Sequence, residues 1–209
     1  MINTIRNMIT GVIPDVWPVV IIVSIIACSL RIVYLVKNNE KFCFYKELFM
    51  LIFIIYVVCL FEVVTLQDDN YGLSNFLPFK EMFRYEFGSR LFIKNIVGNV
   101  LLFLPYGYYS SLYLKSKKII LPSFLALIVS ITIELVQIYI GRTFDIDDVI
   151  LNTLGGILGY LLYRFLEKIR NRLPKFFRSD GFMNFFVVVI FILFFIFLFD
   201  IRVVEWFNY

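Results

Sequence analysis

The feature that most constrains this fold is a series of apolar runs long enough to cross a lipid bilayer. A helix rising 1.5 Å per residue needs about 20 apolar residues to span roughly 30 Å of hydrocarbon. The 209-residue chain is 61% hydrophobic, and such runs recur along it. The runs are continuous rather than alternating, which disfavours a transmembrane β-barrel. The sequence therefore predicts an all-α, polytopic membrane bundle without a separate soluble domain.

We expect about six transmembrane helices. They are predicted at Val16–Val36, Leu48–Leu66, Ile93–Leu114, Ile119–Ile140, Val149–Leu166 and Phe182–Phe199. The chain then divides into an N-terminal two-helix membrane region (1–66), a core of one loop and three helices (67–166), and a basic loop with a C-terminal helix (167–209). The first run is interpreted as a retained span, because it is long and lacks the small-residue cleavage site of a secretion signal.

Basic residues are distributed unevenly between the two sides of these spans. Twelve lie in or beside the loops after the first, third and fifth spans, and seven lie on the other side, diluted by acidic residues. Because basic loops stay in the cytoplasm, the richer side is predicted to be cytoplasmic. Both termini and the loop Gln67–Lys94 are then predicted to lie outside. The net charge of +4 follows from this topology and does not indicate a nucleic-acid partner.

Several kinds of chemistry are excluded by composition. The chain has no histidine, which excludes His-based catalysis and His-ligated zinc. Its three cysteines, Cys28, Cys43 and Cys59, are scattered and odd in number, so neither disulfides nor a metal site is expected. Nucleotide-binding motifs are also absent. We expect no cofactor and no bound metal.

Polar side chains interrupt the apolar runs near one predicted membrane face. A charge at the bilayer centre costs at least about 2.5–3.5 kcal/mol, so intramembrane carboxylates point to function by default. With the predicted orientation, these residues all fall in the outer third of the membrane. Helical periodicity places them on three stripes that could converge on one outward-opening pocket. The residues predicted to bind a ligand there are Asn95, Asn99, Glu134, Gln137, Arg142, Asp145, Asp148 and Asn152.

Neighbouring residues are expected to have structural roles. Asp147 points away from the polar stripe, so it is interpreted as a helix N-cap or as an acid at the positive end of the helix dipole. Pro105 and Gly107 are expected to break or kink the third span. The small residues of the fifth span include a GxxxG spacing and are expected to pack helices closely. They are Gly155, Gly156 and Gly159.

A purely structural alternative stays open for the polar residues themselves. Asn95 and the other amides could act only as interhelical hydrogen bonds, worth about 0.6–2 kcal/mol each. Arg142 could simply neutralise one carboxylate. On that interpretation the polar residues form a scaffold and bind nothing.

Four ordered sequence blocks resemble a known family. They are the loop Asn75–Phe79, the helix stretch Asn95–Gly107, the pair in Glu134–Gln137 and the stretch Asp145–Gly156. In order and spacing they are similar to the NxxPF, GN…FxPxG, ExxQ and DxxDxxxN…GG blocks of the VanZ-like family. The resemblance covers about Asn75–Tyr163 and extends through the core region defined above.

The resemblance implies an integral membrane protein of Gram-positive-type bacteria, with a role in the cell envelope and a link to low-level resistance to the lipoglycopeptide teicoplanin. Two functions fit the residues. The first is a binding or accessory factor whose pocket engages a lipid-linked cell-wall precursor or hinders a lipoglycopeptide. The second is an intramembrane enzyme acting on a polyprenyl or phospholipid substrate, with Glu134 and Asp148 as acid and base or as ligands of a hard cation. An ion-coupled carrier is disfavoured, because the polar groups gather on one side.

Overall fold

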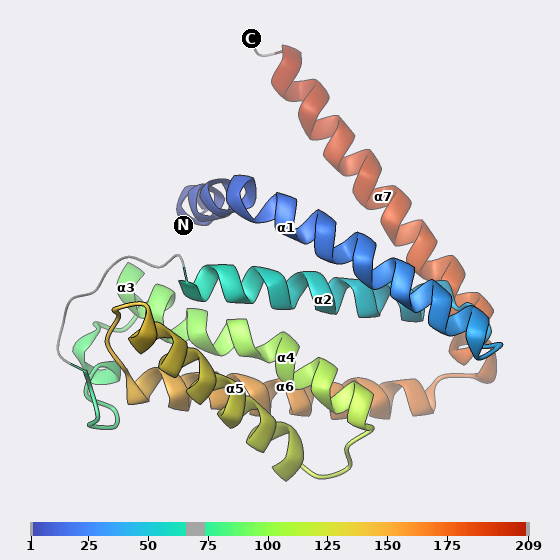
Figure 1. The fold of residues 1–209 in the computed structure, drawn as a ribbon. Helices are drawn as coiled ribbons and strands as arrows, with labels where there is room; N and C mark the ends of the chain where they lie inside the picture. Colours follow the sequence, from blue (N-terminus) through green and yellow to red (C-terminus); the bar gives the residue numbers. More distant parts are fainter. Residues whose placement is uncertain (1, 66–73, 208–209) are drawn as a thin grey trace.

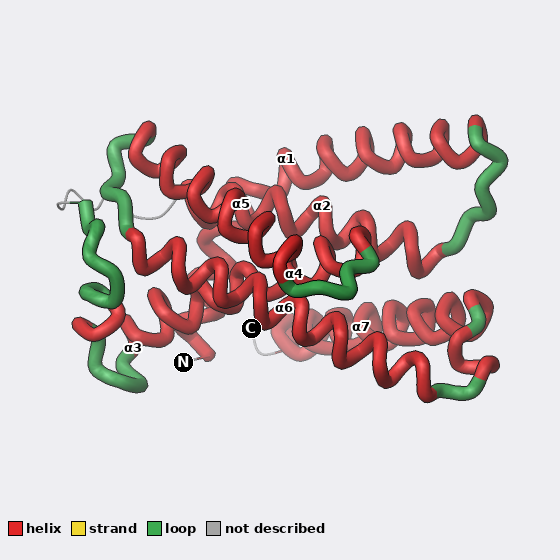
Figure 2. Tube along the Cα trace, turned by 90° about the horizontal axis from the view of Figure 1, so that it is seen from below, coloured by secondary structure: helices red, strands yellow, loops and turns green. Residues whose placement is uncertain are grey.

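The computed structural model describes residues 2–65 and 74–207, and that part of the chain is helical with no β-strand (Figures 1 and 2). Its α-helices are α1 (Ile2–Lys37), α2 (Phe44–Thr65), α3 (Arg90–Phe92), α4 (Gly98–Leu114), α5 (Ile120–Tyr139), α6 (Ile146–Arg172) and α7 (Asp180–Phe207). Short 3₁₀ turns at Met82–Arg84 and Lys175–Arg178 and a π-helical turn at Ile93–Val97 complete it.

The predicted polytopic membrane bundle is confirmed. Within the described residues, five helical stretches are long and apolar enough to cross a membrane. They are Val16–Lys37, Phe44–Thr65, Arg90–Leu114, Ile120–Tyr139 and Ile146–Arg172. In α7, the apolar stretch that can be described, Asp180–Leu193, is shorter. The chain is therefore a multi-pass membrane protein.

Successive helices run in opposite directions along the bundle, so their ends gather into two groups (Figure 1). The ends of α2 and α5, the starts of α4 and α6, and the loop 74–89 lie together; we call this the loop end. The connections 38–43, 115–119 and 173–179 lie at the opposite end, which we call the basic end. The polar residues singled out in the sequence thus share one end of the molecule.

The closest packing joins α4 to α6 and depends on glycine. A Cβ added at Gly107 would overlap the backbone of Gly156, and one added at Gly155 would overlap the carbonyl of Val100. A Cβ at Gly159 would likewise meet the α4 backbone. Because small residues let transmembrane helices approach to backbone contact, this seam fixes how α4 and α6 cross.

The predicted alternative of a break in the third span is wrong, because α4 continues through Pro105 and Gly107 to Leu114. Gly107 allows the close approach of α4 to Gly156 on α6. Three residues before the proline, the hydroxyl of Tyr56 on α2 donates to the carbonyl of Leu102 (2.6 Å), which links α2 to α4.

Polar contacts at the basic end connect the outer helices. The guanidinium of Arg31 on α1 donates twice to the carboxylate of Glu47 on α2 (2.8 and 3.0 Å). At the start of α7, Asp180 accepts hydrogen bonds from Tyr45 (3.0 Å) and Lys46 (3.2 Å) of α2. Charged groups at the basic end are thus paired between helices.

Candidate functional site: a polar pocket at the loop end

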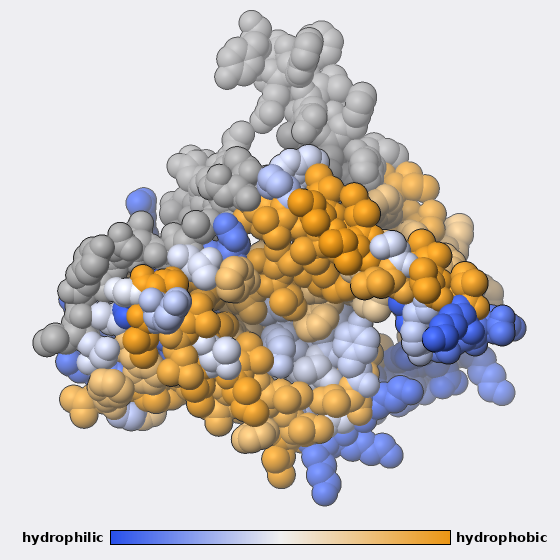
Figure 3. All heavy atoms as spheres, viewed as in Figure 1, coloured by the Kyte–Doolittle hydropathy of each residue, from blue (hydrophilic) through white to orange (hydrophobic). Residues whose placement is uncertain are grey.

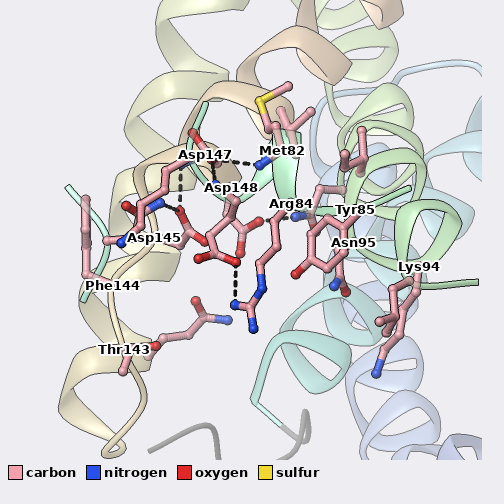
Figure 4. Close-up of a pocket in the computed structure, with 18 of the residues that line it drawn as sticks. Met82, Arg84, Tyr85, Lys94, Asn95, Thr143, Phe144, Asp145, Asp147 and Asp148 are labelled. Atoms are coloured by element: carbon pink, nitrogen blue, oxygen red, sulfur yellow. Dashed lines mark hydrogen bonds and ion pairs between the residues drawn. The ribbon is translucent and has the colours of Figure 1, made fainter. Parts of the chain in front are cut away.

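A cavity of about 730 Å³ opens between the loop 74–89, the start of α4 and the connection from α5 to α6 (Figure 4). Figure 4 shows the α6 carboxylates on one side and Tyr85 and Asn95 on the other. Its lining carries both signs of charge. The charged side chains are Lys80, Glu81, Arg84, Lys94, Arg142, Asp145, Asp147 and Asp148.

The loop that covers the cavity is held by one buried carboxylate. Asp147 is only 1% exposed, and its oxygens accept hydrogen bonds from the backbone N–H groups of Phe79, Glu81 (2.8 Å) and Met82 (3.1 Å). Such charge-assisted bonds are roughly twice as strong as neutral ones. Asp147 therefore anchors the loop to the first turn of α6.

Asp145 caps α6, so the first alternative for Asp147, an N-cap, is wrong; Asp147 is instead an acid in the first turn, as the second alternative predicted. Asp145 is extended (φ −131°, ψ 114°), and its side chain accepts from the N–H of Asp147 (2.9 Å). The same oxygen accepts from the amide of Asn75 (2.9 Å), whose backbone pairs with the residues on either side of Asp145. Burial raises the pKa of the Asp145 carboxyl, and these hydrogen bonds oppose the rise.

Glu134 and Gln137 form the wall behind the pocket. Glu134 is 1% exposed and accepts from the N–H of Asp145 (2.9 Å), which ties the end of α5 to the start of α6. Gln137 satisfies both neighbours in one amide orientation, donating to Glu134 (3.0 Å) and accepting from Arg142 (2.7 Å). Arg142 also donates to the carbonyl of Val64 at the end of α2 (2.8 Å).

Asp148 faces the cavity directly. Its carboxylate accepts a hydrogen bond from the amide of Asn99 on α4, and both residues line the pocket together with Asn95. Asn95 lies in the π-helical turn that precedes α4. Such turns are often found at functional sites.

Two residues predicted for the pocket, Glu134 and Asn152, are outside its lining. Asn152 is buried one turn deeper in α6, and its amide donates to the hydroxyl of Ser130 on α5 (3.0 Å). It is outside the set that lines the cavity. Its observed contact is the interhelical hydrogen bond of the structural alternative.

Sequence reasoning missed the contribution of the loop. Lys80, Glu81, Arg84 and Tyr85 all line the cavity, as does Lys94 beside α4. The guanidinium of Arg84 pairs with Glu81 (3.1 Å). The available signal was the unusual number of basic residues in a loop predicted to lie outside.

No cluster of acidic side chains in the described residues supports the hypothesis that Glu134 and Asp148 hold a hard cation. The described part of the chain contains no group of three or more acidic, cysteine or histidine side chains placed to share a metal ion. Glu134 instead directs an oxygen to the backbone of Asp145.

Comparisons with known proteins agree with the motif blocks. The VanZ/LLP1 family matches residues 47–167, more than half of the chain. The chain belongs to the VanZ-like family. It is also 39% identical over 82 residues to Protein VanZ from Enterococcus faecium, a match covering 38% of this chain and 50% of that relative. The chain thus aligns with about half the length of that relative, and no solved structure matches it.

The family match begins at residue 47, near the start of α2, and so extends further toward the N-terminus than the motif blocks. In this VanZ-like protein the blocks have separable roles. Asn75, Glu134 and Asp145 join the loop, α5 and α6 by hydrogen bonds. Asn99 and Asp148 face the cavity, and the glycines form the α4–α6 seam.

Proposed function

We propose that this VanZ-like protein is a binding or accessory factor of the cell envelope. Its pocket would engage the polar head of a lipid-linked cell-wall precursor or of a lipoglycopeptide. The observation that carries the proposal is the cavity of about 730 Å³, lined by side chains of both charges, at the end of a transmembrane bundle. The distribution of basic residues predicts that this end faces outward.

The lining suits an amphiphile with a complex polar head. Arg84, Lys80 and Lys94 supply cations for phosphate or carboxylate groups. Asp148 and the amides of Asn95 and Asn99 offer partners for hydroxyl, amine and amide groups. A few convergent polar groups in a concave site are what ligand pockets use to fix orientation.

The wall behind these groups supports the same proposal. Glu134 and Gln137 hold the α5–α6 junction, and Asp147 holds the loop, so the cavity is bounded by groups that already have partners. A pre-organised site loses less conformational entropy when it binds. Resistance to teicoplanin would follow if the pocket binds the drug or its target, a property that VanZ-like membership suggests for this chain.

The test compares a knockout strain complemented with wild-type protein, with Asp148→Asn or with Glu86→Gln, at matched membrane expression. Glu86 is an exposed acid of the same loop outside the cavity lining and serves as the matched control. We expect the wild type and Glu86→Gln to raise the inhibitory concentration of teicoplanin more than that of vancomycin, and Asp148→Asn to lose this effect. Equal values for wild type and Asp148→Asn would reject the pocket, and equal values for wild type and empty vector would reject the resistance role.

Orientation has its own test. In a background with the native cysteines replaced by serine, Ser74→Cys at the loop end and Lys118→Cys at the basic end place one exposed thiol at each end. A membrane-impermeant maleimide applied to whole cells should label position 74, and should label position 118 only after permeabilisation. The reverse pattern would place the pocket on the cytoplasmic side.

A further inference from the structure

The loop 74–89 exposes an unusual amount of aromatic surface. Phe76 is 70% exposed, Phe83 87% and Phe87 92%, with Leu77 and Phe79 also exposed. We call residues 76–87 the aromatic elbow. Removing phenylalanine side chains from water is favourable. Exposed apolar side chains gathered on one loop therefore indicate a surface that contacts a membrane or another molecule.

The elbow holds this surface outward by its own backbone. Phe79 adopts a left-handed conformation (φ 67°), which is uncommon for a bulky residue. Its N–H and those of Glu81 and Met82 are fixed by the buried carboxylate of Asp147. The aromatic side chains therefore project from a turn whose backbone is fixed by hydrogen bonds to Asp147.

Cationic side chains alternate with these aromatic residues. Residues 76–94 contain four basic side chains, Lys80, Arg84, Arg90 and Lys94, against two acidic ones. Aromatic rings and basic groups together are typical of the boundary between phosphate headgroups and acyl chains. An aqueous protein partner would not require that combination next to a transmembrane helix.

The elbow is also continuous with the lipid-facing surface of the bundle. It leads through α3 into the stretch Arg90–Leu114, one of the five that can cross the membrane. Leu91 in this connection is exposed, and hydrophobic surface extends from the bundle over the loop end (Figure 3). Only Gly88, Ser89 and Arg90 separate the elbow from the apolar stretch that begins at Leu91. Within the first turns of that stretch the polar residues are Lys94, Asn95 and Asn99.

We propose that the aromatic elbow lies in the membrane interface, with its phenylalanines among the upper acyl chains and its basic side chains at the phosphates. The cavity beneath it then opens at headgroup depth, where the head of an amphiphile already resides. Arg84, which belongs to the elbow and lines the cavity, connects the two environments. The depth of the elbow does not depend on the pocket's ligand, so this proposal and the binding proposal can fail separately.

The test uses an environment-sensitive fluorophore on single cysteines, after Cys28, Cys43 and Cys59 are replaced by serine. The test positions are Phe83→Cys and Phe87→Cys, with Phe76→Cys as a further position on the elbow. Ile128→Cys on the exposed face of α5 reports the hydrocarbon core, and Lys118→Cys at the basic end reports water. The protein is reconstituted in phosphatidylcholine–phosphatidylglycerol vesicles, and only variants with the wild-type size-exclusion profile are scored.

We expect emission from the elbow positions to be blue-shifted relative to Lys118→Cys. We also expect stronger quenching by a spin label near the lipid headgroup than by one near the acyl-chain end, with the opposite order at Ile128→Cys. Emission matching Lys118→Cys with quenching by aqueous iodide would place the elbow in water and overturn the proposal. A quenching order matching Ile128→Cys would also overturn it, because it would place the elbow in the hydrocarbon core.

Discussion

Two stretches of α6 bind the rest of the core by different means. At the start of the helix, Asp147 accepts hydrogen bonds from the loop, and Asp148 accepts one from Asn99 on α4. Two turns further along, Gly155 and Gly156 make no polar contact through side chains and instead let backbones touch. The first stretch depends on its hydrogen-bond partners, and the second depends on glycines that have no side chain.

The difference indicates how each stretch responds to mutation. At Gly107, Gly155 and Gly159 the nearest atom to an added Cβ is backbone, which cannot move aside as a flexible side chain can, so the added carbon must separate two helices. At the polar start, each carboxylate has its own partner, and the cost of a change depends on how many N–H groups lose an acceptor. We therefore expect the loss of stability caused by a mutation to decrease from the glycine seam to the cavity.

The largest effect is expected at the seam. Gly107→Ala should destabilise the bundle by about 3 kcal/mol, because the new Cβ overlaps the backbone of Gly156. Gly98→Ala in the same helix is the matched control, since its Cβ would meet only the Ile93 carbonyl at 3.7 Å. Thermal stability in detergent, followed by size-exclusion recovery after heating, measures both. If both variants tolerate heating equally, the seam does not limit stability.

The next effect is expected at Asp147. Asp147→Asn keeps the shape but turns one acceptor oxygen into a donor, so at least one buried N–H of the loop loses its partner. We expect a loss of about 1–3 kcal/mol in local stability. Trypsin, which cleaves after Lys80 and Arg84, should then cut the loop faster than in Glu86→Gln. Unchanged cleavage would mean that other contacts hold the loop.

A smaller effect is expected where α5 meets α6 below the pocket. The hydrogen bond from Asn152 to Ser130 should contribute about 0.6–1.7 kcal/mol, the range found for polar pairs between transmembrane helices. A double-mutant cycle with Asn152→Ala and Ser130→Ala measures it through detergent melting. Additive effects of the two mutations would show that the pair is not coupled, and would reopen a ligand role for Asn152.

Much of this arrangement could be predicted from sequence because it follows from periodicity and charge. The apolar runs gave the helices, and alternate helix directions brought Asn99 and Asp148 to the same end. Helical phase does not apply to Asp145, which is extended and precedes α6, although Asp145 does line the cavity. Asp147, expected to point away from the polar stripe, lines the cavity as well.

The loop could not be placed in this way. Asp147 contacts residues 65 to 68 positions earlier in the chain, and Asn75 meets Asp145 across 70 positions. No local periodicity encodes contacts between an irregular segment and a helix start so far apart. Most of the residues that line the cavity, including Arg84 and Tyr85, were therefore not predicted from the sequence.

The smallest effect on folding, and the sharpest on function, is expected at Asp148. Asp148→Asn keeps the oxygen that accepts from Asn99, so stability should change by less than about 1 kcal/mol. It replaces the acidic group that faces the cavity beside Asn99 with a neutral amide, so ligand-dependent resistance should be lost while heating and trypsin profiles match the wild type. Asp147→Asn is the same chemical change one residue earlier and should show the reverse order, with the larger structural loss. Equal structural loss in both variants would mean that the start of α6 is a scaffold throughout, and that the cavity contributes only shape.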